Sequence, residues 1–337
     1  MVRMSKDPSY DIERREAIAA VLQACRLCGS VQATHLSGGV IGKEDGSPVT
    51  VADYGAQALV SAHLATRFPN DPLVSEEDAH LLRQPQNARV KEVVMRHVAD
   101  LHPRLDEEQM LEAIDRGKAS GGSSGRFWTL DPIDGTKGFL RGDQYAVALA
   151  LVEEGEVVLG VLGCPNLRFD PLNPRGPKGS LFVAVRGEGS AMRIMDGAEE
   201  TKIQVSTLDD PSEALFCESV ESSHSSHEES AEVAQILGTE KPPLRIDGQC
   251  KYGLLARGDV SLYLRFPTRK SYRETLWDHA AGCIIVQEAG GRVTDLQGRP
   301  LDFSSGRQLE RNRGILASNG RLHDTVLDAV QRVWREP

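Results

Sequence analysis

The pattern of hydrophobic and polar positions divides the chain into alternating helices and strands. Apolar residues that recur at helical spacing predict one helix over 11–29 and a second that begins near Asp53. The same spacing predicts further helices over 88–118, 277–290 and 323–334, and one that ends at about residue 237. Period-two alternation and short apolar runs predict strands over 72–78, 127–130, 144–152, 156–164, 181–185, 191–194, 214–219, 260–266, 292–295 and 314–317.

Glycine-bearing turns join some of these strands into hairpins. Residues 153–155 separate one antiparallel pair of strands, and residues 187–189 separate another. Polar, glycine-rich or proline-rich stretches predict loops over 37–47, 120–125 and 170–180. The predicted fold class is therefore α/β, in the form of an α+β layered sandwich in which helix pairs alternate with mixed and antiparallel sheets.

The strand over 127–130 runs directly into the string Asp-Pro-Ile-Asp-Gly-Thr at 131–136. The proline stiffens the exit from the strand, and the glycine lets the backbone turn sharply or approach a ligand. Asp131 and Asp134 can converge on a hard cation, with the carbonyl oxygen of Ile133 as a further ligand. Thr136 adds a hydroxyl beside them. The whole string is more specific than a bare pair of aspartates, because it sets the strand end, the turn and the ligands together.

Three other acidic positions stand at the ends of predicted elements. Asp53 lies in the first turn of a helix, where it can cap the helix or face a metal. Glu76 begins three consecutive acids after a short strand, an arrangement that is either a solvated turn or a group in need of a counter-charge. Asp278 opens the helix over 277–290. Together with Asp131 and Asp134, these acids form an oxygen-only ligand set, which suits Mg²⁺ better than Zn²⁺.

Composition excludes several classes of function. Lys and Arg number 39 against 49 Asp and Glu, and this net charge of −10 argues against a nucleic-acid partner. No apolar run approaches the roughly 20 residues that span a bilayer, so no membrane association is expected. Residues 1–10 lack the apolar segment of a secretory signal. Six scattered cysteines suit a reducing compartment, and we read the pair Cys25 and Cys28 as buried apolar positions. We therefore expect a cytoplasmic protein, and a monomer rather than a dimer.

The candidate acids favour attack by an activated water over a covalent mechanism. Two Mg²⁺ ions roughly 4 Å apart can bind the attacking water and the leaving oxygen of a phosphate ester. The sequence has no cysteine nucleophile in a phosphate-binding loop and no Gly-x-x-x-x-Gly-Lys-Ser/Thr motif. These absences disfavour a covalent route and a nucleoside-triphosphate mechanism.

Two signatures in this chain, taken as a pair, resemble those of the inositol monophosphatase superfamily. They are residues 131–136 and the Trp-Asp-His-Ala-Ala-Gly string at 277–282, which is followed by Glu-Ala-Gly-Gly at 288–291. Within the superfamily, the segments at 125–142 and 220–227 resemble the 3′(2′),5′-bisphosphate nucleotidases. The similarity extends from about residue 12 to 333 and implies an inositol monophosphatase-like fold. On this basis we expect residues 1–205 to form an α+β half that binds metal and residues 206–337 an α/β half that binds substrate.

The resemblance also implies roles for particular residues. It assigns two or three Mg²⁺ ions to Glu76, Asp131, Ile133 through its carbonyl, Asp134 and Asp278, with Glu77 in support. It assigns Asp53 and Thr136 to catalysis, because an aspartate that accepts from a hydroxyl leaves the hydroxyl oxygen free to accept from water. Substrate contacts are implied for Gly135, Thr136, His227, Gly248, Lys251, Arg265 and Asp278.

Gly248 departs from the family pattern. The nucleotidases have a serine there that contacts the nucleotide, so this chain lacks that hydroxyl contact.

The activity that the resemblance implies is a Mg²⁺-dependent phosphatase. It would convert adenosine 3′,5′-bisphosphate to AMP and phosphate, would also act on 3′-phosphoadenylyl sulfate within sulfate assimilation, and would be inhibited by lithium. The alternative is the same chemistry on an inositol phosphate, as in inositol polyphosphate 1-phosphatase or inositol monophosphatase. A nucleotide sensor without catalysis is disfavoured, because the expected carboxylates and Thr136 are all present.

Overall fold

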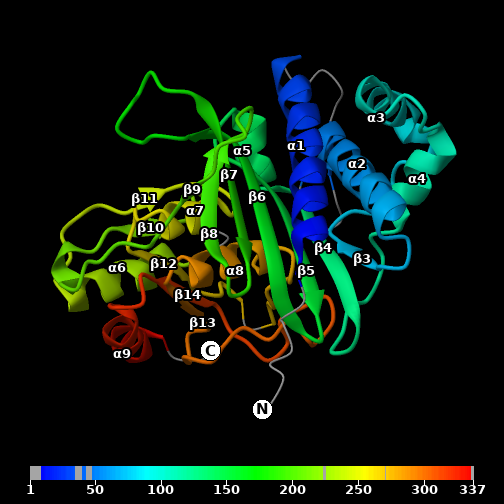
Figure 1. Ribbon diagram of the computed structural model, residues 1–337. Coiled ribbons are helices and arrows are strands. Elements are labelled where there is room, and N and C mark those ends of the chain that lie inside the picture. The colour runs from blue at the N-terminus through cyan, green and yellow to red at the C-terminus, as the bar shows by residue number, and fades with distance from the viewer. Residues whose placement is uncertain (1–8, 35–39, 43–47, 223–224, 270, 335–337) are drawn as a thin grey trace, which may run out of the picture.

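Two β-sheets form the frame of the molecule, and helices pack on both of them (Figure 1). The computed structural model describes residues 9–34, 40–42, 48–222, 225–269 and 271–334. The larger sheet has the strand order β3-β4-β5-β6-β7-β8-β9. Its strands are β3 (Leu73–Ser75), β4 (Arg126–Asp134), β5 (Ala146–Glu153), β6 (Glu156–Arg168), β7 (Lys178–Val185), β8 (Gly189–Ile194) and β9 (Thr201–Lys202). β3 and β4 pair in parallel, and the other neighbours are antiparallel.

The smaller sheet has the order β11-β10-β12-β14-β13. Its strands are β10 (Phe216–Glu218), β11 (Leu244–Arg245), β12 (Leu262–Arg265), β13 (Arg292–Thr294) and β14 (Ile315–Ser318). β10 pairs in parallel with both β11 and β12, whereas β14 pairs antiparallel with β12 and β13. A separate ribbon pairs β1 (Val40–Gly42) with β2 (Pro48–Thr50).

The helices and sheets form five layers, in the order helix, sheet, helix, sheet, helix (Figure 1). α1 (Asp11–Ala33) and α2 (Val51–Arg67) cover one face of the larger sheet. α7 (Cys250–Ala256) and α8 (Ala280–Glu288) fill the layer between the two sheets. α6 (His227–Leu237) and α9 (His323–Val333) pack on the outer face of the smaller sheet. The remaining elements are α3 (Ala88–Leu101) and α4 (Glu107–Asp115) beside α2, α5 (Thr136–Arg141) after β4, η1 (Pro85–Asn87) and η2 (Pro211–Glu213).

Burial on both faces explains the composition of the central strands. Residues 146–152 of β5 are all buried, because helices cover both faces of the larger sheet, and they read as one continuous apolar run. The first residues of α8, 280–286, are likewise all buried between the sheets. Gly160 on β6 lets α8 approach closely, since a Cβ at this position would lie 2.8 Å from the carbonyl oxygen of Ala281. These contacts fix the start of α8, and with it Asp278, relative to the larger sheet.

The predicted layered α/β class is confirmed, and so are the two antiparallel hairpins, β5–β6 and β7–β8. The helix predicted over 88–118 is two helices, α3 and α4. Pro103 lies in the break, and Asp106 begins the second helix by accepting a hydrogen bond from the Gln109 N–H at 2.9 Å. The predicted loop 37–47 falls largely outside the described residues, although Val40–Gly42 forms β1.

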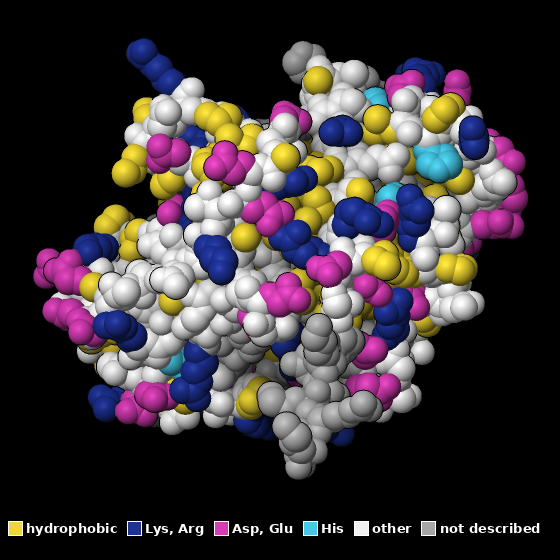
Figure 2. Space-filling model, in the orientation of Figure 1, with side chains coloured by type: hydrophobic (Ala, Val, Ile, Leu, Met, Phe, Trp, Pro, Cys, Tyr) yellow, Lys and Arg dark blue, Asp and Glu magenta, His cyan; other side chains and the backbone are white. Residues whose placement is uncertain are grey.

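Charged side chains of both signs are spread over the visible face of the molecule (Figure 2). Figure 2 shows Lys and Arg side chains interspersed with Asp and Glu over one face, with no single basic field. Among the described helices, none is both long enough and apolar enough to cross a bilayer. The larger sheet uses residues 73–202 and the smaller sheet residues 216–318. The division into halves at residue 205 stays a prediction.

Candidate active site

The parallel pairing of β3 with β4 places two acids side by side. Ser75 is opposite Leu130 in the register, so the next residues along the two strands are Glu76 and Asp131. Parallel strands end at the same edge of a sheet, and both carboxylates therefore lie at that edge. Glu76 is partly buried, and Asp131 is buried at 2% exposure.

A bulge in β4 brings Asp134 to the same side as Asp131. Asp131 is opposite Ala148 and Asp134 is opposite Ala146, so β4 carries one more residue than β5 across this interval. In a regular strand, residues three apart point to opposite faces, and one extra residue reverses this relation. The backbone N–H of Ile133 donates to Asp131 Oδ1 at 3.0 Å and holds that carboxylate in place.

A cavity of about 520 Å³ lies at this edge and collects most of the predicted site residues. The predicted residues that line it are Glu76, Asp131, Ile133, Asp134, Gly135, Thr136, Gly248, Lys251, Arg265 and Asp278. The sequence prediction missed other lining residues, which are Lys137, Ser219, Asp247, Tyr272, Thr275 and Trp277. The position of two of these in the sequence pointed to the site, since Trp277 directly precedes the predicted residue Asp278 and Asp247 directly precedes the predicted residue Gly248.

The acids in the cavity oppose one another's ionisation. Burial raises the pKa of Asp131 well above its usual range, and the charges of Glu76 and Asp134 raise it further. Burial and the charge of Asp278 raise the pKa of Asp134 to about 7. A cluster of acids with this electrostatic cost, offering only oxygen ligands, fits hard divalent cations such as Mg²⁺. The residues that would hold them are Glu76, Asp131, Asp134, Asp278 and Ile133 through its carbonyl.

Asp53 links the start of α2 to Thr136. Its Oδ2 accepts from the Thr50 backbone N–H at 2.8 Å and from the Thr50 hydroxyl at 2.6 Å, which completes a capping box. Its Oδ1 is 3.5 Å from Thr136 Oγ1, which also lies 3.2 Å from the Ile133 carbonyl oxygen. Asp53 is fully buried, and its carboxylate both completes the capping box of Thr50 and lies within reach of the Thr136 hydroxyl.

Two cations, Lys251 and Arg265, line the cavity together with the acids. Lys251 is buried, and its Nζ donates to the carbonyls of Gly248 at 2.8 Å and Ile246 at 3.2 Å. Burial lowers the pKa of Lys251, while the charge of Asp134 acts in the opposite direction. Arg265 ends β12, and its Nη2 lies 3.7 Å from Asp278 Oδ2. These groups place positive charge beside the acidic cluster.

A buried network holds Arg265 in its orientation. Glu274 Oε2 lies 2.9 Å from Arg265 Nε and 3.0 Å from His279 Nε2. The other ring nitrogen of His279 lies 2.8 Å from the Tyr252 hydroxyl, and Arg265 Nη2 donates to the Tyr272 hydroxyl at 2.9 Å. Burial alone would raise the pKa of Glu274, but Arg265 and His279 lower it, so the ionised carboxylate is stabilised. Arg265 therefore points toward the cavity in one fixed geometry.

Gly248 has a steric reason to be glycine in this chain. Its φ is +63°, a left-handed conformation that side chains disfavour. A Cβ at this position would collide with the carbonyl oxygen of Asp134. Gly135, with φ of +93°, faces it, since a Cβ at Gly135 would lie 3.0 Å from the Gly248 nitrogen. The two glycines thus let the backbone that follows β4 and the backbone that precedes α7 meet beside Asp134.

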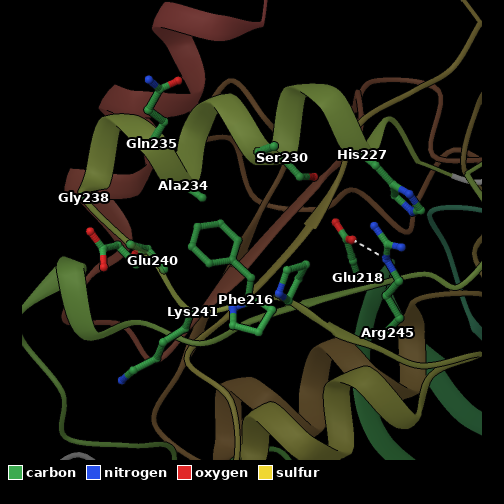
Figure 3. A pocket seen from close by; sticks show the side chains of 14 residues that line it. Phe216, Glu218, His227, Ser230, Ala234, Gln235, Gly238, Glu240, Lys241 and Arg245 are labelled. Atoms are coloured by element: carbon green, nitrogen blue, oxygen red, sulfur yellow. Dashed lines mark hydrogen bonds and ion pairs between the residues drawn. The ribbon is translucent and has the colours of Figure 1, made fainter.

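The structure places His227 outside the cavity of the acids. His227 begins α6 and lines a second cavity of about 530 Å³, shown in Figure 3. The Phe216 ring faces α6 there, and the Glu218–Arg245 ion pair lies beside the His227 ring (Figure 3). His227 Nε2 is 2.9 Å from the carbonyl oxygen of Ser219, which lines the first cavity. Ser223 and His224, part of the same predicted segment, lie outside the described residues.

Charged residues at the cavity rim connect the two halves. Arg141 Nη1 donates to Glu221 at 2.8 Å and its Nη2 donates to Asp247 at 2.6 Å, while Lys137 lies 3.4 Å from Glu221. Burial raises the pKa of Asp247, and Arg141 partly offsets this shift. α5 therefore carries both the residues that follow the acidic string and the ion pairs to Glu221 and Asp247.

A family model described as the inositol monophosphatase family matches residues 8–335. The chain belongs to the inositol monophosphatase family. Relatives from Oryza sativa (48% identical) and Emericella nidulans (44% identical) are both named 3′(2′),5′-bisphosphate nucleotidase, and each alignment covers 97% of this chain. The alignments cover 96% and 99% of those relatives.

Solved structures show the same fold for this member of the family. An inositol monophosphatase from Thermotoga maritima matches with a TM-score of 0.65 at 23% identity, covering 96% of this chain and 98% of its own. One from Anabaena matches with a TM-score of 0.61 at 21% identity, covering 96% of each chain. The predicted inositol monophosphatase-like architecture is thereby confirmed.

Proposed function

We propose that the chain is a Mg²⁺-dependent 3′(2′),5′-bisphosphate nucleotidase. It hydrolyses the 3′-phosphate of adenosine 3′,5′-bisphosphate to give AMP and phosphate, and it also acts on 3′-phosphoadenylyl sulfate. The observation that carries this proposal is the single cavity in which Glu76, Asp131, Asp134 and Asp278 face Lys251 and Arg265. The names of the relatives, which match nearly the whole chain, favour a nucleotide over an inositol phosphate.

The proposed chemistry divides between bound metal and the chain's own groups. When bound, two or three Mg²⁺ ions would supply positive charge to the scissile phosphate and to the leaving ribose oxygen. A hydrogen bond from the Thr136 hydroxyl to Asp53, whose Oδ1 lies 3.5 Å away, would leave the lone pairs of the Thr136 oxygen to accept from the attacking water. Arg265, with its planar fork of donors, suits the phosphate that is not cleaved.

The second cavity supports a substrate larger than an inositol phosphate. Glu218 lines this cavity and the adjacent Ser219 lines the first, so the two cavities lie on either side of one strand end. We propose that the nucleoside extends from the acids toward His227. The same proposal includes inhibition by lithium and a role in sulfate assimilation. It also includes a monomeric state, a cytoplasmic location and two functional halves that divide at residue 205.

A phosphate-release panel tests the proposal. The purified protein is assayed with adenosine 3′,5′-bisphosphate, 3′-phosphoadenylyl sulfate, inositol 1,4-bisphosphate and inositol 1-phosphate, with and without Mg²⁺ and Li⁺. We expect the two nucleotides to be the preferred substrates, only with Mg²⁺, and Li⁺ to inhibit. Preference for an inositol phosphate, or turnover in EDTA, would contradict the proposal.

Asp134→Asn is the matching variant. It keeps the shape of the side chain but removes one charge from the metal cluster, so we expect kcat to fall at least about a hundredfold. Asp324→Asn is the control, because Asp324 is exposed on α9 and forms a surface ion pair with Arg292 at 2.7 Å. If Asp134→Asn keeps wild-type turnover, Asp134 does not belong to the metal site.

A further inference from the structure

Arg307 connects the two halves of the molecule behind the acidic cavity. It lies in the segment between β13 and β14, on the side of the smaller sheet. Its guanidinium donates to the carbonyl oxygens of Gly117 at 3.0 Å and Ala119 at 2.9 Å, and also to that of Ser75. Ser75 is 232 residues away in sequence. One side chain thus donates hydrogen bonds to three backbone carbonyls in and beside the larger sheet.

The carbonyl of Ser75 belongs to the residue directly before Glu76. Ser75 is fixed from other sides as well, because its N–H donates to the Gly117 carbonyl at 2.8 Å and its hydroxyl donates to Gln57 at 2.5 Å. The same Gly117 carbonyl accepts from Arg307. Arg307 therefore fixes the position of the backbone that directly precedes Glu76.

On its other side, Arg307 holds the segment that carries Asp278. Its guanidinium carbon lies 4.7 Å from the centre of the Trp277 ring, within the range of a cation–π contact. Its backbone carbonyl accepts from the Leu276 N–H at 3.1 Å. Trp277 lines the cavity and directly precedes Asp278. Arg307 thus contacts the neighbours of two acids that come from distant segments of the chain, one after β3 and one just before α8.

We propose that Arg307 is a positioning residue for the metal site. It sets the separation between the Glu76 and Asp278 carboxylates by fixing the residues that precede each of them. This inference rests on the proposed function, because the separation matters only if these acids share bound cations. Groups behind the ligands of a metal commonly change its affinity 10- to 100-fold when they are lost.

The geometry requires arginine and not another cation. Three carbonyls accept from two nitrogens of one planar group, which also lies over an indole ring. A lysine ammonium is a point charge that cannot hold this fork and stack at once. Lysine at position 307 should therefore keep the charge but lose part of the positioning.

Mn²⁺ binding to the metal-free protein tests the proposal without relying on turnover. Free Mn²⁺ is followed by its electron paramagnetic resonance signal during a titration of the wild type and of Arg307→Met, which keeps the aliphatic stem. We expect Arg307→Met to bind Mn²⁺ at least about tenfold more weakly. Arg311→Met is the matched control, because Arg311 lies in the same segment, is exposed, and pairs with Asp302 at 3.3 Å. It should bind Mn²⁺ like the wild type.

Arg307→Lys provides a second variant if Arg307→Met does not fold, as judged by circular dichroism in EDTA. If both variants fold, the Mn²⁺ affinity of Arg307→Lys should lie between those of the wild type and Arg307→Met. If only Arg307→Lys folds, its Mn²⁺ affinity should be several-fold below that of the wild type. Wild-type Mn²⁺ affinity in a folded Arg307→Met or Arg307→Lys protein would overturn the positioning role while leaving the proposed function intact. Failure of the wild type itself to bind Mn²⁺ would overturn the metal site and the proposed function together.

Discussion

At the scale of single residues, the acids were predictable because each one stands at the end of a predicted element. Asp131 follows the apolar run 127–130 of β4, and Asp53 lies in the first turn of α2. A carboxylate in such a place is either part of a cap or a ligand, and the structure shows that Asp53 completes the capping box of Thr50 and also accepts from Thr136. Arg307 and Glu274 gave no such signal. Their importance comes from contacts with residues that are distant in sequence or buried with them, and no local pattern records those contacts.

Gly248 offers a direct test at this scale. Gly248→Ser restores the residue of the family pattern, but its Cβ must displace the Asp134 carbonyl. We expect Gly248→Ser and Gly248→Ala to lose about 1–3 kcal/mol of unfolding free energy and to have lower kcat. Denaturant unfolding and steady-state kinetics would measure both effects. The alanine variant is the control for the Cβ alone, and a serine variant with lower KM and unchanged stability would refute the steric explanation.

At the scale of elements, the sequence predicted the helices and strands that have a regular hydrophobic pattern, and it missed features that depend on irregular segments. The two hairpins were predictable because short glycine turns and alternation are local. The helix over 88–118 was predicted as one because its apolar spacing continues past Pro103, whereas the proline and the cap at Asp106 divide it. α7 was missed because its 7 residues, Cys250–Ala256, are too few to show a repeated helical spacing. The bulge that aligns Asp131 with Asp134 depends on β5, which the string at 131–136 does not contain.

The segment that joins β12 to α8 carries a prediction about substrate choice. Glu274 orients Arg265, so Glu274→Gln should loosen Arg265 and raise KM for adenosine 3′,5′-bisphosphate about tenfold, the effect of losing one charge-assisted hydrogen bond. Adenosine 3′-monophosphate lacks the second phosphate, and its KM should change little. Glu310→Gln is the control, since Glu310 is exposed and lies 3.9 Å from Arg273. An equal rise in KM for both substrates would show that Glu274 acts on the whole site and not through Arg265.

At the scale of the whole molecule, the acidic cavity couples metal binding to protons. In the metal-free protein, burial and the charge of Asp278 raise the pKa of Asp134 to about 7, so the folded state holds a proton that the unfolded state releases above pH 4. This group therefore lowers folding stability as pH rises from about 4 through 7. Mg²⁺ binding must expel the proton, and its affinity should rise with pH over the same range.

Calorimetry measures this coupling. Mg²⁺ titrations at pH 6.5 in two buffers with different ionisation enthalpies should give different apparent heats, and the number of protons released should fall above pH 7. Asp134→Asn should release fewer protons than the wild type. Equal heats in the two buffers would show that the acids are already ionised before the metal binds.

The acids come from segments that are far apart in the sequence, and this makes the cation a folding ligand as well as a cofactor. Glu76 follows β3, Asp131 and Asp134 lie in β4, and Asp278 lies just before α8, so the unfolded chain has no comparable site. By mass action, free Mg²⁺ at one hundred times its dissociation constant would add about 2.7 kcal/mol to the free energy of unfolding. A fall in the available magnesium would thus reduce both the rate of the enzyme and the amount of it that stays folded.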